Sequence, residues 1–244
     1  MRLSLIPCLA LMLILSACGW AQPLQNSRQT SNQTFQIQLA ENLQTESARF
    51  EPILERFRQT LEALPLAPQQ KITVEIRSCR QANAFYIPSE RLIVMCPGLL
   101  DTLSRRFGEN QGQETFHFVM LHELAHALID QLNLPILGNE EDAADAMATV
   151  LLLEQANSPI GAILAGIDFY EQYQQGFITP WAGVHAIGPQ RMFNLVCWAS
   201  GGQPGLLENR LIRRLNSEMQ ALNRNCSQEY SQQERAVKTL LGLS

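Results

Sequence analysis

Residues 115–130, TFHFVMLHELAHALID, form the most informative stretch of this 244-residue chain. An α-helix advances about 100° per residue, so His122 and His126 lie one above the other on the same face. Two neutral imidazoles at this spacing can bind one zinc ion, and the carboxylate of Glu123 lies beside them. Apolar side chains surround the motif nearly all round the helix, so its polar histidines need partners, which a metal supplies. The stretch therefore predicts a buried, zinc-binding helix.

A second helix, predicted from residue 140 to about residue 154, supplies carboxylates for the same site. Residues 134–138, LPILG, end the first helix, and Asn139 is expected to cap the second. Glu141 and Asp145 stand four residues apart and share one helix face. We expect Glu141 to be the third zinc ligand, which leaves a position open for water. Asp145 is expected to accept the second ring N–H of a ligand histidine.

Two neighbouring acids compete with Glu141 for the ligand role. Glu140 and Asp142 point about 100° away from it, one on either side of the helix. Acids in the first turn of a helix complement its macrodipole, which explains these two residues but not Asp145. The partner at i+4 therefore favours Glu141. The alternative for the whole motif is a helix whose histidines are solvated or paired with acids and bind no metal.

Several motifs resemble those of known metallopeptidases. HExxH followed by a helix that bears ExxxD resembles the gluzincins, the thermolysin-type zincins. Residues 83–100 resemble the NAF–hairpin–GLL segment that precedes HExxH in the membrane-associated heat-shock-type gluzincins. From about residue 73 to residue 230, the chain is similar to a bacterial family of metallopeptidases known as a domain of unknown function. The resemblance rests on NAFY, HELAHALID, LPILGNEEDAAD, QRMFNLVCW and NCSQEY, in that order.

This resemblance implies a zincin-like α+β fold and peptidase chemistry on a peptide or protein substrate. It implies zinc on His122, His126 and Glu141, with Glu123 as the general base and Asp145 behind a ligand histidine. The gap between His126 and Glu141 is shorter than in thermolysin, so thermolysin-like specificity is not implied. His₂Glu sites also suit cobalt or manganese, so the identity of the metal stays open.

Zinc-promoted amide hydrolysis also needs a hydrogen-bond donor for the tetrahedral intermediate. We expect His185 to be this donor, with Arg191 and Tyr86 as second choices. The alternative for His185 is a loop histidine that caps the following helix. His117 lies about 140° round the helix from His122 and is expected to be structural.

The remaining periodicity predicts a small N-terminal sheet followed by packed helices, an α+β fold. The strand at residues 84–86 could bind an extended peptide by β-addition, although a packing role for its aromatic residues is equally consistent with the pattern. The expected strands are 35–39, 72–76, 84–86 and 92–95, and the expected helices outside the motif include 44–63, 159–173 and 189–199.

The N-terminus has the layout of a secretory signal in residues 1–17, with an apolar run too short to span a membrane. Residues 15–18, LSAC, resemble the bacterial lipobox, so Cys18 is expected to carry a lipid that anchors the protein in the bacterial cell envelope. The alternative is ordinary cleavage at a nearby small residue. Residues 18–34, rich in Gln, Asn, Ser and Thr, predict a flexible tether, and residues 35–244 predict a single domain.

Charge and cysteine content narrow the class of protein. The net charge is −5 at pH 7 and no basic run occurs, so we expect no nucleic-acid partner. Four cysteines remain beyond the signal and Cys18, an even number that predicts two disulfides in an exported chain. Three pairings are possible, and we favour Cys79–Cys96 across the predicted hairpin and Cys197–Cys226 between C-terminal helices. No CxxC pair occurs, which argues against a cysteine metal site.

Two other functions stay open at this point. One is a catalytically silent zincin-fold lipoprotein that acts as an envelope chaperone or binding module. The other is a hydrolase of peptidoglycan cross-links, which HExxH chemistry also permits. The intact Glu123 argues against the first, because a structural metal site has no need of a base.

Overall fold

The computed structural model describes residues 34–65, 68, 70–154, 188–205, 217 and 223–243. The signal segment 1–17, Cys18, the tether up to residue 33, the helix expected at 159–173, and His185 lie outside these residues. Within the described ranges, no helix combines the length and apolarity needed to cross a bilayer.

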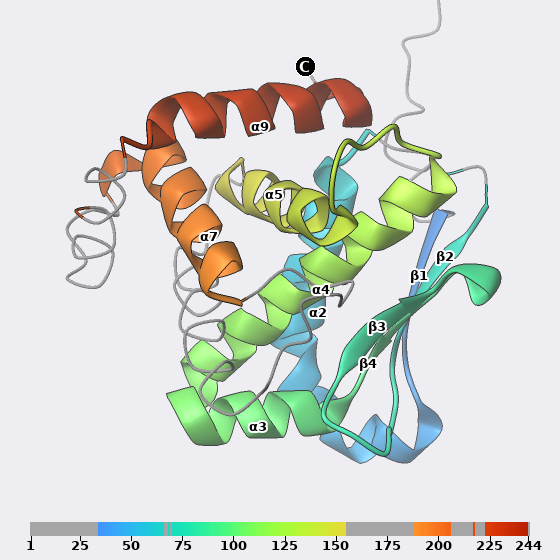
Figure 1. Ribbon diagram of the computed structural model, residues 1–244. Helices are drawn as coiled ribbons and strands as arrows, with labels where there is room; N and C mark the ends of the chain where they lie inside the picture. The colour runs from blue at the N-terminus through green and yellow to red at the C-terminus, as the bar shows by residue number, and fades with distance from the viewer. Residues whose placement is uncertain are drawn as a thin grey trace, which may run out of the picture.

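A four-stranded mixed sheet forms one side of the molecule (Figure 1). Its strands are β1 (Phe35–Leu39), β2 (Ile72–Ile76), β3 (Ala84–Ile87) and β4 (Leu92–Met95), in the order β1-β2-β4-β3. Strands β1, β2 and β4 are parallel to one another, whereas β3 pairs antiparallel with β4 and lies at an edge of the described sheet. The expected strands are thus confirmed, and the α+β class with them.

A 3₁₀ helix and one long helix lie between β1 and β2 in the chain, a short 3₁₀ helix (η2, Pro88–Glu90) lies between β3 and β4, and the other described helices follow β4. Apart from η2, the helices pack on the sheet or on one another. They are η1 (Glu41–Glu46), α2 (Ser47–Ala63), α3 (Pro97–Phe107), α4 (Glu109–Gln131), α5 (Glu140–Leu153), α7 (Gly188–Gly202) and α9 (Cys226–Leu241).

Helix α4 runs through the middle of the fold. It contacts α2, α3, α5 and strands β3 and β4, which explains why apolar residues occur nearly all round it. It begins at Glu109, six residues before the start expected at residue 115. The prediction from apolar spacing missed the first turns of α4 because their residues are mostly polar. At Gly112 a Cβ would lie 2.7 Å from the Ser104 backbone nitrogen, so the glycine allows α3 and α4 to approach closely.

Helix α5 begins where the sequence predicted. The side chain of Asn139 accepts a hydrogen bond of 2.9 Å from the backbone N–H of Glu141, so it caps the helix. The cap fixes the first turn of α5, in which three acids follow one another: Glu140, Glu141 and Asp142.

Both favoured disulfides are present. Cys79–Cys96 joins the segment after β2 to the end of β4, and Cys197–Cys226 joins α7 to the first residue of α9. Closing the Cys79–Cys96 loop, with its sequence separation of 17, stabilises the fold by about 3 kcal/mol on chain-entropy grounds.

The C-terminal pair α7 and α9 is tightly joined. A Cβ at Gly201 would lie 2.1 Å from the carbonyl oxygen of Cys226, so only glycine permits this approach. Arg224 donates a hydrogen bond of 3.2 Å to Asn194 of α7 and forms an ion pair with Glu229 of α9. A covalent bond, a close backbone contact and polar contacts thus hold the two helices together.

His117 is fully buried in α4, in keeping with a structural role. Its ring lies edge-on to Phe57, with centroids 6.4 Å apart, and neither ring nitrogen has a hydrogen-bond partner among the residues that the structure describes. Burial lowers the pKa of His117 to about 3, and the charge of nearby Arg56 acts in the same direction.

We therefore expect His117 to make the protein less stable in mild acid. The unfolded chain binds a proton here below about pH 6.5, and the folded chain does not until about pH 3, so stability falls as the pH falls through this window. The slope is about 1.4 kcal/mol per pH unit, or about 2 kcal/mol between pH 6.5 and pH 5. Urea unfolding of wild type and His117→Leu measures it. Parallel stability–pH curves for the two proteins would contradict the prediction.

Candidate metal centre

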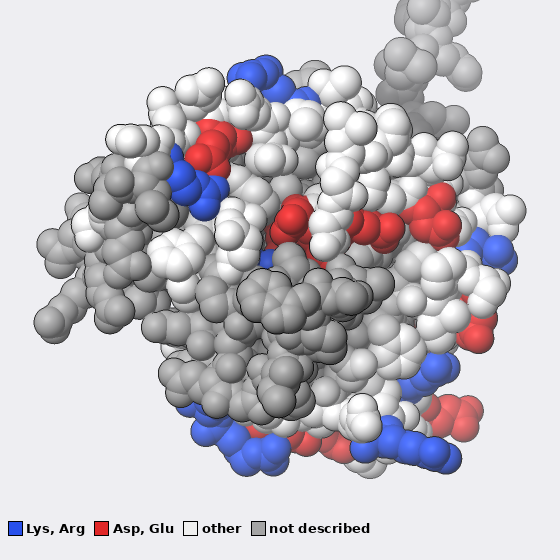
Figure 2. Space-filling model, viewed as in Figure 1, with Lys and Arg blue, Asp and Glu red and all other residues white. Residues whose placement is uncertain are grey.

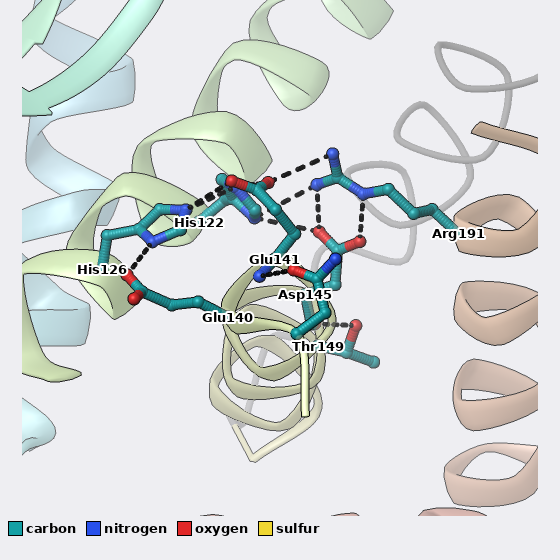
Figure 3. A network of polar contacts seen from close by, with 8 residues as sticks. His122, His126, Glu140, Glu141, Asp145, Thr149 and Arg191 are labelled. Carbon is teal, nitrogen blue, oxygen red and sulfur yellow. Dashed lines mark hydrogen bonds and ion pairs between the residues drawn. The ribbon is translucent and has the colours of Figure 1, made fainter. Parts of the chain in front are cut away.

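The two histidines of the motif face each other on adjacent turns of α4 (Figure 3). The Nε2 atoms of His122 and His126 are 3.1 Å apart, and their rings are nearly perpendicular. Because α4 is packed on several sides, its backbone fixes the positions of the Cα and Cβ atoms of both histidines. Two ring nitrogens this close converge on one point in space.

Glu141, from the first turn of α5, completes the cluster. Its Oε2 lies 3.2 Å from His122 Nε2, and its Oε1 lies 3.4 Å from His126 Nε2. An ion bound at about 2.0–2.1 Å by tetrahedral ligands requires ligand atoms about 3.3 Å apart. The observed separations fit such an ion. Among the described residues, His122, His126 and Glu141 form a group whose ligand atoms lie close enough together to bind one metal ion. The His₂Glu donor set suits zinc and similar divalent metals.

A carboxylate lies behind each of the two histidines. Asp145 Oδ1 is 2.9 Å from His122 Nδ1, and Glu140 Oε1 is 2.7 Å from His126 Nδ1. A hydrogen bond donated from Nδ1–H leaves the Nε2 lone pair directed at the convergence point. Sequence reasoning anticipated the position of Asp145 but treated Glu140 as a competing ligand or a helix-end charge. The spacing along α5 gives no signal for the Glu140 contact, because its partner lies on another helix.

Arg191, from α7, pairs with two of these acids. Its Nε lies 2.6 Å from Asp145 Oδ2, its Nη2 donates to Asp145 Oδ1 at 2.8 Å, and its Nη1 lies 3.3 Å from Glu141 Oε2. The sequence suggested Arg191 only as a second-choice donor to a reaction intermediate. Figure 3 instead shows it engaged with Asp145 and Glu141, so its first contribution is to orient and neutralise carboxylates.

The centre favours positive charge. Burial alone would lower the pKa of His122, but its hydrogen bonds to Asp145 and Glu141 raise it to about 9. Burial alone would raise the pKa of Glu141, yet the bonds to the two histidines hold it well below its ordinary value. Acidic side chains are visible in Figure 2 over the region where α5 lies in Figure 1. The same carboxylates therefore stabilise either a proton on the histidines or a metal cation bound between them.

Glu123 has a different environment from the other acids. Burial raises its pKa, and the nearby charges of His122 and His126 lower it less than burial raises it. Its carboxyl group also receives a hydrogen bond from the backbone of Tyr86 in β3. A buried carboxyl whose pKa lies above its ordinary value accepts a proton more readily, which suits a general base.

Tyr86 and His185 were expected as possible hydrogen-bond donors to the tetrahedral intermediate. The hydroxyl of Tyr86 donates a hydrogen bond of 2.7 Å to Asp130, near the end of α4 and two turns beyond Glu123, so it is engaged away from the cluster. His185 lies outside the described residues. The backbone of Tyr86, in contrast, lies beside Glu123, which puts an edge strand next to the centre.

A family model named DUF4344 and described as "Putative metallopeptidase" matches residues 29–241, most of the chain. No curated protein and no solved structure matches the chain.

Proposed function

The chain belongs to this metallopeptidase family, and from that premise we propose that it is a zinc-dependent peptidase of gluzincin type. The convergence of His122 Nε2, His126 Nε2 and the Glu141 carboxylate at separations of 3.1–3.4 Å carries the proposal. This arrangement leaves one tetrahedral position for water, as catalytic zinc sites do.

The surrounding residues have the chemistry for amide hydrolysis. A bound divalent cation supplies a Lewis acid that acidifies water and polarises a carbonyl. Glu123 then takes the proton from the attacking water and delivers it to the leaving amine. His185 remains our proposed donor to the tetrahedral intermediate. Asp145 and Arg191 hold His122 and Glu141 in place.

Strand β3 is our proposed site for the peptide substrate. Cys96 N–H bonds to the carbonyl of Asn83, and alternation along the antiparallel pair directs the backbone groups of Ala84 and Tyr86 away from β4. The Tyr86 N–H bonds to Glu123, so an added peptide would pair with the Tyr86 carbonyl and with the backbone of Ala84. An extended peptide that adds to this edge lies beside Glu123. Main-chain hydrogen bonds of this kind form with many peptide sequences, so contacts with the substrate side chains would set the cleavage specificity.

We also propose a location. Two disulfides are compatible with an exported protein. With the signal expected in residues 1–17 and a lipid on Cys18, the domain is tethered in the bacterial cell envelope and meets peptide substrates there.

Metal analysis and a cleavage assay test the function. The exported chain, produced from residue 19 onward, is expected to bind one zinc ion and to cleave a mixed peptide library in a Glu123-dependent way. Stoichiometric zinc without Glu123-dependent cleavage of any substrate would favour a silent binding module. Cleavage confined to muropeptides would favour a peptidoglycan hydrolase.

Zinc is expected to stabilise the folded chain. A ligand that binds only the folded state stabilises it by about 2.7 kcal/mol at a free concentration of one hundred times its Kd. Urea unfolding with chelator and with buffered zinc measures this gain. Glu141→Ala, which removes one ligand, is expected to lose most of it. A gain of equal size in both proteins would place the zinc elsewhere.

A further inference from the structure

We infer that Glu140 is a positioning residue that sets the ring orientation and tautomer of His126. The inference rests on the metal site proposed above and adds a residue to it. Glu140 is not a ligand in this arrangement, since its carboxylate lies on the far side of the imidazole from the cluster (Figure 3).

The geometry supports this role directly. Glu140 Oε1 lies 2.7 Å from His126 Nδ1, at normal hydrogen-bond distance. The other ring nitrogen of His126 lies 3.1 Å from His122 Nε2 and 3.4 Å from Glu141 Oε1. With Nδ1–H donated to Glu140, the Nε2 lone pair is left for the metal. The opposite tautomer would put a hydrogen atom on Nε2 and block it.

The two histidines are supported in unequal ways. Asp145, behind His122, has a side chain that is 1% exposed and is paired with Arg191. The side chain of Glu140, behind His126, is 50% exposed, and no buried cation of the described residues pairs with it. Among the described residues, the Nδ1 side of the His126 ring is therefore held by one partly exposed contact, and a substitution can remove this contact with less damage to the core than a substitution at Asp145.

Local structure explains why Glu140 reaches His126. The Asn139 cap fixes the first turn of α5, and side chains of a helix lean towards its N-terminus. In that turn Glu140 reaches back to α4 while the next residue, Glu141, faces the cluster. The macrodipole alone also favours an acid at this position, so the experiment must separate charge from hydrogen bonding.

Cobalt(II) titration of four proteins makes this separation. The proteins are wild type, Glu140→Ala, Glu140→Gln and Glu154→Ala, and the readouts are the Kd and the d–d absorption of the bound cobalt. Removing a hydrogen-bond partner of a ligand histidine raises the Kd about 10- to 100-fold, which we expect for Glu140→Ala. Glu140→Gln keeps an acceptor oxygen and removes the charge, so it is expected to restore most of the affinity and the wild-type spectrum.

Glu154→Ala is the matched control. Glu154 caps the other end of α5, its side chain is 42% exposed, and it is ion-paired with Lys238 at 3.2 Å. Its loss removes an acid of similar exposure at the C-terminal end of the same helix, far from His126 in sequence, and cobalt affinity is expected to stay unchanged.

The outcomes distinguish the inference from the function that it rests on. Unchanged affinity in Glu140→Ala, beside a wild type that binds one cobalt ion, overturns the role of Glu140 and leaves the metal site intact. Equal losses in the Ala and Gln variants overturn it as well, because charge and not orientation would then be responsible. A wild type that binds no cobalt overturns the metal site itself, and the role of Glu140 with it.

Discussion

Glu123→Gln is expected to lower kcat/KM for peptide hydrolysis by about 10²- to 10⁴-fold, the usual contribution of a general base. The amide keeps the shape of the side chain and cannot accept a proton from water. His122 precedes Glu123 in α4, but the Glu123 side chain contacts the backbone of Tyr86 and is not one of the converging ligand atoms. Zinc content is therefore expected to stay at the wild-type level.

The measurement pairs hydrolysis rates with metal analysis on the same samples. Glu109→Gln is a suitable control, since Glu109 is an exposed acid in the first turn of the same helix. It should change neither rate nor zinc content. Full activity in Glu123→Gln would exclude Glu123 as the base, and loss of zinc would show that it supports the ligands instead.

Arg191→Met is expected to have the largest effect on stability. Breaking a buried ion pair by removal of one partner costs about 3–5 kcal/mol, because it leaves an uncompensated buried charge. Arg191 and Asp145 are both buried, and the guanidinium contacts Asp145 through two of its nitrogens, at 2.6 and 2.8 Å. Methionine fills a similar volume without the charge, so the loss reports mainly on electrostatics.

Urea unfolding at pH 7 with a chelator present measures this effect without a metal contribution. Adding Asp145→Asn to Arg191→Met should recover part of the loss, since the stranded negative charge is then gone. Arg191→Lys is expected to recover little, because an ammonium group cannot make the two parallel bonds of a guanidinium. A loss below about 1 kcal/mol in Arg191→Met would show that the pair is solvated and contributes little.

Local patterns predicted the parts of the fold that depend on neighbours in sequence. The spacing of His122 and His126, the Asn139 cap and the alternation in β2 each follow from helix or strand periodicity, and the structure contains them. The two disulfide pairings followed from cysteine positions in a predicted hairpin and between predicted helices. The zincin-like character of the fold and the catalytic roles stay predictions.

Contacts between distant elements could not be predicted in the same way. Arg191 is 46 residues from Asp145 in sequence, and Glu140 is 14 residues from His126. No periodicity links such pairs, because their approach depends on how α7 and α5 pack against α4. The polar beginning of α4 was missed for a related reason: its packing against α3 depends on Gly112 and not on an apolar pattern.

The disulfide between α7 and α9 bears on the order in which the protein matures. A newly made chain emerges with both histidines and Glu141 well before Cys226, yet Arg191 is carried by the helix that Cys226 secures. We therefore expect charge neutralisation in the centre to be completed late in folding, after α9 has been made and the disulfide that joins it to α7 has formed. In a reducing environment this disulfide would be absent, and the position of Arg191 would depend on the non-covalent packing of α7 against α5 and α9.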